Sequence, residues 1–284
     1  MHLQLQRMAV WLSLFCTVHS ISSAAINIIG YDPLVNDRFA NDASFIASGF
    51  DLSGVAIADD GRWVTMLSDN VFVTADHFYS PNGTSVTFYG SNDPLGSSFT
   101  TSIQSSVQLG TTDIRLGVLN DALPTGYSSY DIFDYPIPPN TNAIAVGMFG
   151  RSPSDYPISL DMSLGQNVMN GFLGDFTAAG NTGDAGYTTF DTTGGLAYEA
   201  QLTTGDSGAP VVAVSGGELT IVGVNWFIAT DTSNNEISGF SYLPNYIAEI
   251  DSFIAANALT PVPESAATAL AFCVLACFAG VRRR

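Results

Sequence analysis

The sequence predicts an all-β fold, built as a sandwich or a pair of barrels, with one helix at its C-terminal end. Between Ile26 and about Leu259, short apolar or alternating runs are separated by Gly, Asn, Asp, Ser and Pro. These turn residues recur at intervals of about 8–12 residues, the spacing typical of sandwiches and barrels. The clearest candidate strands are Gly54–Ala58, Val71–Thr74, Ser85–Tyr89, Ile114–Leu119, Ala143–Phe149 and Leu219–Trp226.

The segment Leu243–Leu259 is the exception, because its apolar side chains recur at the spacing of one helix face. They are Tyr246, Ile247, Ile250, Phe253 and Ile254. We therefore expect an amphipathic helix there. The proline-rich stretch Leu123–Asn142 is the best candidate for a connection between two barrels.

Residues 1–25 have the pattern of a secretory signal peptide. They combine Arg7, the apolar stretch Met8–Val18 and a run of small residues that ends at Ala25. This pattern predicts export and cleavage after Ala24 or Ala25.

Residues 261–284 contain Pro263-Glu264-Ser265, then the apolar run Ala266–Val281 and three arginines. Together these parts resemble a PEP-CTERM tail, although Ser265 stands where that signal has a second proline. The resemblance implies sorting by an exosortase-type machinery in a Gram-negative-type bacterium, with a membrane contact that lasts until the tail is cleaved. A permanent C-terminal membrane anchor is the alternative.

The charge between these two end segments is strongly negative. Residues 26–260 hold 25 acidic side chains against four arginines, a net charge of about −21. Such a surface repels nucleic acid and anionic membranes, so no nucleic-acid partner is expected. Cys16, Cys273 and Cys277 all fall in the end segments, which leaves no disulfide, thiol nucleophile or cysteine metal site between them.

The most informative motif is Gly205-Asp206-Ser207-Gly208-Ala209-Pro210, which directly precedes the apolar run Val211–Val214. Its glycines allow a tight turn and leave room for a substrate to approach the Ser207 hydroxyl. The same turn can aim the N–H groups of Gly205 and Ser207 at one point, as an oxyanion hole requires.

A second motif, Val71–Phe78, reads as a strand that ends at His77. This is the only histidine between the end segments, and therefore the only imidazole that could act there as a base. The neighbouring Asp76 carboxylate would raise the pKa of His77 if it faced the ring.

In the third motif, Thr112–Leu119, Asp113 opens an alternating strand. An acid at such a place is often only a turn residue, but its order between His77 and Ser207 favours a role beside them. Asp131 and Asp134 are the alternatives, although neither opens a comparable apolar strand.

In this order, the three motifs resemble the histidine, aspartate and serine segments of the chymotrypsin/trypsin-like serine proteases. The resemblance extends patchily over about 45–257. It implies two six-stranded antiparallel β-barrels with a C-terminal helix: residues 26–135 would form the barrel with His77 and Asp113, and 136–260 the barrel with Ser207. It further implies a secreted endopeptidase that cuts polypeptides through an acyl-enzyme, without metal or cofactor.

The same resemblance assigns the substrate-binding residues. Gln201 falls at the base of the primary pocket and Gly239 at one wall, while Asn225, Trp226 and Phe227 belong to the strand that pairs with the substrate backbone. Asn225 and Phe227 depart from the family's usual serine and glycine. With an uncharged base and a bulky Phe227, the pocket is expected to take a small or medium neutral side chain.

The family also pairs the aspartate before the nucleophile, here Asp206, with a newly formed N-terminal amine. No Arg or Lys stands in Ala25–Asn27 for a trypsin-type activating cut. Cleavage of the signal peptide after Ala25 would itself supply the amine, at Ile26.

Two other functions fit the same residues. One is a trypsin-fold surface protein for binding or adhesion, inactive because Asp76, Phe227 or an unformed pocket disables it. The other is an all-β matrix protein, such as a jelly-roll sugar binder, whose motifs match by chance. The acidic loops Asp59-Asp60 and Asp231–Glu236 lack EF-hand spacing, which favours solvated turns over calcium sites.

Overall fold

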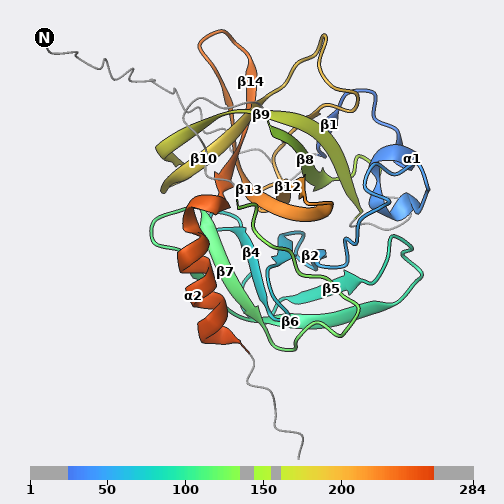
Figure 1. Ribbon diagram of the computed structural model, residues 1–284, viewed down its shortest axis with the longest axis vertical. Helices are drawn as coiled ribbons and strands as arrows, with labels where there is room; N and C mark the ends of the chain where they lie inside the picture. The colour runs from blue at the N-terminus through green and yellow to red at the C-terminus, as the bar shows by residue number, and fades with distance from the viewer. Residues whose placement is uncertain (1–24, 135–143, 155–160, 259–284) are drawn as a thin grey trace, which may run out of the picture.

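A computed structural model describes residues 25–134, 144–154 and 161–258 (Figure 1). Nearly half of these residues belong to β-strands, which pair antiparallel in the sheets. Six strands form a closed barrel in the spatial order β2-β3-β4-β7-β6-β5, with β5 paired to β2 again. They are β2 (Val55–Ala58), β3 (Trp63–Met66), β4 (Val71–Ala75), β5 (Ser85–Tyr89), β6 (Ser98–Gln108) and β7 (Ile114–Leu119).

Six further strands form a second antiparallel sheet in the order β10-β14-β13-β12-β8-β9, and β9 pairs with β10 again through a hairpin. They are β8 (Ile144–Arg151), β9 (Met162–Ala178), β10 (Asn181–Thr189), β12 (Pro210–Ser215), β13 (Glu218–Thr230) and β14 (Glu236–Tyr242). The barrel occupies the lower half of Figure 1 and the second sheet the upper half.

Strands at the junction of the two sheets are apolar on both faces, which explains their continuous apolar sequence. In β4, Phe72 packs inside the barrel, whereas its neighbour Val73 belongs to a core shared by both sheets. That shared core also contains Phe149 and Val224 from the second sheet. Because successive side chains point to opposite faces of a strand, one five-residue segment serves both cores.

The N-terminal segment packs on the second sheet, although it precedes the barrel in sequence. Strand β1 (Asn27–Ile28) pairs with β11 (Ala200–Gln201). The short helices α1 (Pro33–Asn36) and η1 (Arg38–Ala40) follow β1 in the chain. Ile26 and Ile28 lie in the apolar core of the second sheet. Residues 26–28 therefore pack on the second sheet, whereas Arg38 reaches the first barrel, where it donates to the carbonyl oxygens of Val55 (3.0 Å) and Tyr89 (2.9 Å).

The last described elements are η2 (Leu243–Tyr246) and the helix α2 (Ile247–Asn257), which runs beside the barrel in Figure 1. Ile250 is fully buried in the shared core, as expected for the apolar face of this helix. The all-β class, a closed six-stranded barrel and the C-terminal helix are thus confirmed, and each of the six candidate strands overlaps a strand.

The predicted connection Leu123–Asn142 is described as far as residue 134. Ile132 bridges to Ile221, and the N–H of Phe133 donates to the Ile221 carbonyl oxygen at 2.9 Å, so the connection reaches β13. The predicted signal peptide, except Ala25, and the predicted tail lie outside the described residues. Among the helices of the described ranges, none combines the length and apolar character needed to cross a membrane.

Candidate active site

Two of the three candidate residues are brought together by strand register. His77 follows β4 and Asp113 precedes β7; these strands are antiparallel neighbours, with Ala75 opposite Ile114. The end of one strand therefore lies beside the start of the other, and the Asp76 N–H donates to the Asp113 carbonyl oxygen at 3.1 Å.

Ser207 reaches this point from the second sheet, in the turn that leads into β12. His77 Nε2 lies 2.9 Å from Ser207 Oγ, and His77 Nδ1 lies 2.9 and 2.8 Å from the two carboxylate oxygens of Asp113. The carboxylate accepts from Nδ1–H, so Nε2 carries the lone pair that faces the hydroxyl. The structure thus brings together the three residues singled out from sequence.

Burial differs across this hydrogen-bonded series. The Asp113 side chain is fully buried, while the His77 side chain keeps 20% of its surface exposed. The carboxylate also accepts the backbone N–H of His77 at 2.8 Å, which fixes the start of the histidine loop to the same oxygen. Asp113 is therefore held inside, and the imidazole edge stays accessible from solvent.

The glycine after Ser207 is required by the backbone and by its neighbours. Gly208 has a φ of +85°, and a Cβ there would stand 2.6 Å from Thr74 Oγ1 and 3.1 Å from the Ala75 nitrogen. The serine turn therefore rests directly on β4, two residues before His77. This close approach seats the hydroxyl against the imidazole.

Two N–H groups of this turn remain available for a ligand. The Asp206 N–H donates to the Thr203 carbonyl oxygen at 3.2 Å, and the Gly208 N–H to that of Asn225 at 2.9 Å. Within the described part of the chain, neither the Gly205 N–H nor the Ser207 N–H donates a hydrogen bond. Because nearly all backbone donors in folded proteins are paired, these two are candidates for holding a substrate oxygen.

Asp206 is turned inward and fully buried. Its carboxylate accepts the N–H groups of Thr203 (2.8 Å) and Arg151 (2.9 Å), but burial still raises its pKa to about 7. A Cβ on Gly150 would lie 2.6 Å from Ile26 Cβ and 2.7 Å from Asp206 Oδ1, so the buried Ile26 lies next to this carboxylate.

The Asp76 carboxylate does not face the imidazole. It pairs with the Arg115 guanidinium, at 2.9 Å from Nε and 2.8 Å from the nearer terminal nitrogen. Arg115 also lies over the Tyr79 ring, 3.5 Å from its centroid. Asp76 thus forms an ion pair with Arg115 beside the histidine loop.

The candidate substrate-binding residues fall into two groups. Asn225 is fully buried and donates to the carbonyl oxygens of Phe149 (2.8 Å) and Asp206 (3.1 Å), so it braces the serine turn from inside. Gln201 lies in β11 opposite Asn27, whose amide donates to its side-chain oxygen at 3.2 Å.

Phe227 and Gly239 lie opposite each other on β13 and β14. A Cβ on Gly239 would stand only 2.1 Å from the Phe227 ring, so the ring lies flat over the glycine. Phe176 of β9 covers the other side of Phe227, with ring centroids 4.4 Å apart. Trp226 joins this cluster and donates its indole N–H to the Ala178 carbonyl oxygen at 3.3 Å.

Asn181 is a member of the site that sequence reasoning missed. Its amide nitrogen donates to Asp113 Oδ1 at 2.5 Å, from the start of β10 in the second sheet. It belongs to no motif and lies 68 residues from Asp113 in sequence. The only local signal is Gly180 with its φ of +85°, which marks a hairpin turn but not the contact.

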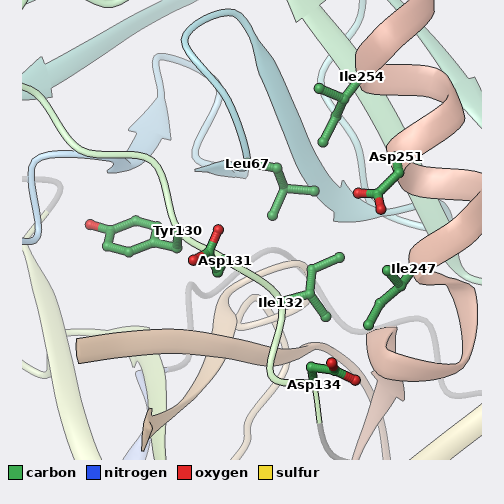
Figure 2. A pocket seen from close by; sticks show the side chains of 8 residues that line it. All are labelled: Leu67, Tyr130, Asp131, Ile132, Asp134, Ile247, Asp251 and Ile254. Carbon is green, nitrogen blue, oxygen red and sulfur yellow. The ribbon is translucent and has the colours of Figure 1, made fainter. Parts of the chain in front are cut away.

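A separate pocket of about 340 Å³ lies between α2 and the connecting segment (Figure 2). It shares no residue with the His77–Ser207 site, and it holds Asp131 and Asp134, the two alternatives to Asp113. Its lining consists of Leu67, Tyr130, Asp131, Ile132, Asp134, Ile247, Asp251 and Ile254.

The acidic loops weighed as calcium sites use their carboxylates internally. Asp60 pairs with Arg62 at 2.7 Å, and Asp231 accepts the backbone N–H groups of Ser233 and Asn235 at 2.8 Å each. In the ranges the structure describes, no group of three or more His, Cys, Asp or Glu side chains is placed to hold a metal ion.

Comparison with known proteins adds no relative. No protein-family model matches the chain, and the search of curated proteins finds no similar sequence. The functional argument therefore rests on the residues and their geometry.

Proposed function

We propose that this protein is an exported serine endopeptidase of the chymotrypsin/trypsin-like class, in which the barrel and the second sheet are the two six-stranded barrels of that fold. The observation that carries the proposal is the continuous hydrogen-bonded series Ser207–His77–Asp113 across the junction of the sheets. Its order in the chain and its inward-turned Asp206 also match the family resemblance.

In this proposal Ser207 Oγ attacks the carbonyl carbon of a peptide bond while His77 Nε2 takes the hydroxyl proton. Asp113 holds the Nδ1–H tautomer and stabilises the imidazolium. The carbonyl oxygen becomes an oxyanion held by the free N–H groups of Gly205 and Ser207. His77 then protonates the leaving amine as the C–N bond breaks, and a water molecule hydrolyses the acyl-enzyme by the same proton route.

The contact between Phe227 and Gly239 supports a shallow primary pocket. The ring covers the glycine that would otherwise form an open wall, and Phe176 backs it from β9. Together with the uncharged Gln201, this arrangement favours a small or medium neutral side chain before the cleaved bond.

The surroundings of Asp206 support activation by a new N-terminus. Cleavage after Ala25 would turn the Ile26 nitrogen into an ammonium group next to a buried carboxylate. Such a pair would offset the desolvation of Asp206. Export and release by exosortase-type cleavage of the tail complete the proposal.

Labelling with a fluorophosphonate probe tests the proposal. The full chain is expressed in a secreting bacterial host, and the N-terminus of the product is determined by mass spectrometry. We expect the wild type and Ser215→Ala, which removes an exposed serine of β12, to react alike. Ser207→Ala should not react, and His77→Ala should react at least about a thousandfold more slowly.

The same experiment separates the alternative function. The observation favouring a binding or adhesion protein is the covered pocket wall at Phe227. A folded product that begins at Ile26 and still does not react with the probe would overturn the endopeptidase proposal in favour of that alternative.

A further inference from the structure

We propose that Asn181, at the tip of the β9–β10 hairpin, is a positioning residue that sets the basicity of His77 through Asp113. The inference rests on the proposed function above, because it concerns the same histidine. It also makes a claim that the sequence resemblance does not contain: a side chain from the second sheet completes the environment of the aspartate.

The first step is the hydrogen-bond inventory of the Asp113 carboxylate. Oδ1 accepts from the His77 backbone N–H at 2.8 Å and from the Asn181 amide at 2.5 Å, and both oxygens face His77 Nδ1. In a fully buried site, each donor withdraws part of the negative charge that the imidazolium would otherwise experience. Within the described ranges, Asn181 is thus the one side chain besides His77 that hydrogen-bonds to this carboxylate.

The second step is that the amide orientation is fixed by its own partners. Asn181 Oδ1 accepts from Gln108 Nε2 at 3.0 Å, and the same nitrogen donates to the Thr112 carbonyl oxygen at 2.9 Å. Gln108 can approach Asn181 only as a donor here, so Asn181 must present its oxygen to Gln108 and its NH₂ to Asp113.

The tip of the β9–β10 hairpin is also hydrogen-bonded through its backbone to the turn that precedes Asp113. The Thr182 N–H donates to the Thr111 carbonyl oxygen at 2.8 Å, and Thr111 Oγ1 donates back to the Thr182 carbonyl oxygen at 3.3 Å. Asn181 itself is buried, with 7% of its surface exposed. The amide is therefore placed by a rigid two-point contact between the sheets.

Other charged groups surround the site but remain unchanged in the test. The Asp76–Arg115 pair flanks the histidine loop, and Asp184 follows on β10, where its N–H donates to the Tyr246 hydroxyl of η2 at 2.9 Å. Removing the Asn181 donor leaves more negative charge on Asp113. Because an opposite charge nearby favours the charged imidazolium, the pKa of His77 should rise.

The experiment is an NMR titration of the His77 imidazole, with ¹⁵N-labelled histidine, in the full chain carrying His2→Gln and His19→Gln. His77 is then the only histidine. Asn181→Leu keeps the side-chain volume and removes the donor, and we expect the pKa of His77 to rise by about one unit. The acid limb of the fluorophosphonate rate profile should move upward by the same amount, so labelling slows by up to about tenfold on that limb and recovers in alkali.

Two further variants serve as a control and as a second test of the Asn181 contact. Asn170→Ala alters another asparagine of the hairpin, one that accepts the Thr189 N–H, and should titrate like the wild type. Gln108→Leu removes the group that orients the Asn181 amide and should shift the His77 titration in the same direction by a smaller amount. If Asn181→Leu does not fold, Gln108→Leu and the shorter Asn181→Ala, which also lacks the donor, carry the test.

Unchanged His77 titration in a folded donor-deleted variant overturns the inference, as does a labelling rate lowered equally at every pH. If the titration shifts but even the wild type never reacts with the probe, the positioning role stands and the proposed peptidase function fails. The two claims are thus tested separately.

Discussion

At the scale of single residues, the candidate pocket is governed by one aromatic ring and one missing side chain. Phe227 lies so close to Gly239 that any Cβ there would overlap the ring. The Phe227 ring also packs against Phe176, with ring centroids 4.4 Å apart. The side chain accommodated before the cleaved bond should therefore depend on Phe227 more than on the pocket base at Gln201.

We predict that Phe227→Ala widens the preference from small to large apolar side chains. Removing the ring uncovers Gly239, and the kcat/KM ratio of a phenylalanine to an alanine substrate should rise about tenfold or more. Peptide-library profiling measures this ratio. Ile228→Ala, which trims an exposed neighbour on the same strand, is the control. An unchanged ratio in Phe227→Ala would rule out a role for the ring in specificity.

A second residue-scale prediction concerns pH and Asp206. An unfolded aspartate titrates near pH 4, whereas burial raises the pKa of Asp206 to about 7. Between these values the folded chain holds a proton that the unfolded chain has released. The free energy of unfolding should therefore fall as the pH rises from about 4 to about 7.

Urea unfolding across this range measures the effect in the chain that retains residues before Ile26. Burial also raises the pKa of Asp161 to about 7, so the comparison with Asp206→Asn isolates the term of interest. In the chain that begins at Ile26, the new ammonium group should lower the pKa of Asp206. The part of the pH dependence of the unfolding free energy that is due to Asp206 should then disappear. Equal slopes in wild type and Asp206→Asn would contradict the assignment.

At the scale of elements, the serine turn and β4 behave as one unit. Gly208 touches Thr74 and Ala75 directly, so the position of the nucleophile is set by a strand that belongs to the other sheet. Asn225 braces the turn from the second sheet with its two amide contacts. The distance between Ser207 and His77 is thus controlled by how closely two elements approach.

We predict that Gly208→Ala keeps the fold but loses about 100-fold in probe labelling rate, because a Cβ would push the turn away from β4. Gly217→Ala is the matched control: it has a similar φ of +93° but open space around it. Circular dichroism establishes folding in both variants. A labelling rate in Gly208→Ala equal to that of Gly217→Ala would show that the contact with β4 does not set the position of Ser207.

At the scale of the whole molecule, the dominant feature is negative charge. The chain has a formal net charge of −18, and it contains no lysine. The four arginines between the end segments all make local contacts: Arg38 is fully buried, Arg62 and Arg115 pair with acids, and Arg151 donates to the Gly61 carbonyl oxygen. The remaining carboxylates repel one another in the compact state.

We predict that salt stabilises the protein: the Tm should rise by several degrees between about 20 mM and about 500 mM NaCl, as the Debye length shortens. Differential scanning calorimetry measures this. Repeating the series near pH 4, where carboxylates are about half protonated, should shrink the effect. A salt response of equal size at both pH values would argue against self-repulsion as its cause.

The parts of the molecule that could be predicted from sequence are those with local signals. Alternating runs such as Ser85–Tyr89 became strands, the 3.6-residue pattern around Ile250 became α2, and three motifs placed His77, Asp113 and Ser207. The contacts that could not be predicted join residues far apart in sequence. Asn181 of the second sheet hydrogen-bonds to Asp113 beside the barrel. The Asp76 carboxylate points to Arg115, which strand register brings beside it. The packing of residues 26–28 on the second sheet could not be predicted either, because β1 is only two residues long.

The pairing of β1 with β11 has a consequence for the order of events in the life of the chain. Asn27 pairs with Gln201, which lies 174 residues later in the chain. Strand β1 therefore has no pairing partner until β11 has been synthesised. Closing so long a loop carries a large entropic cost, so we expect this pairing to form late in folding. We therefore expect residues 26–28 to cover the buried Asp206 carboxylate only after the second sheet has formed. The residues beside Asp206 that are synthesised first are thus the last to take their positions.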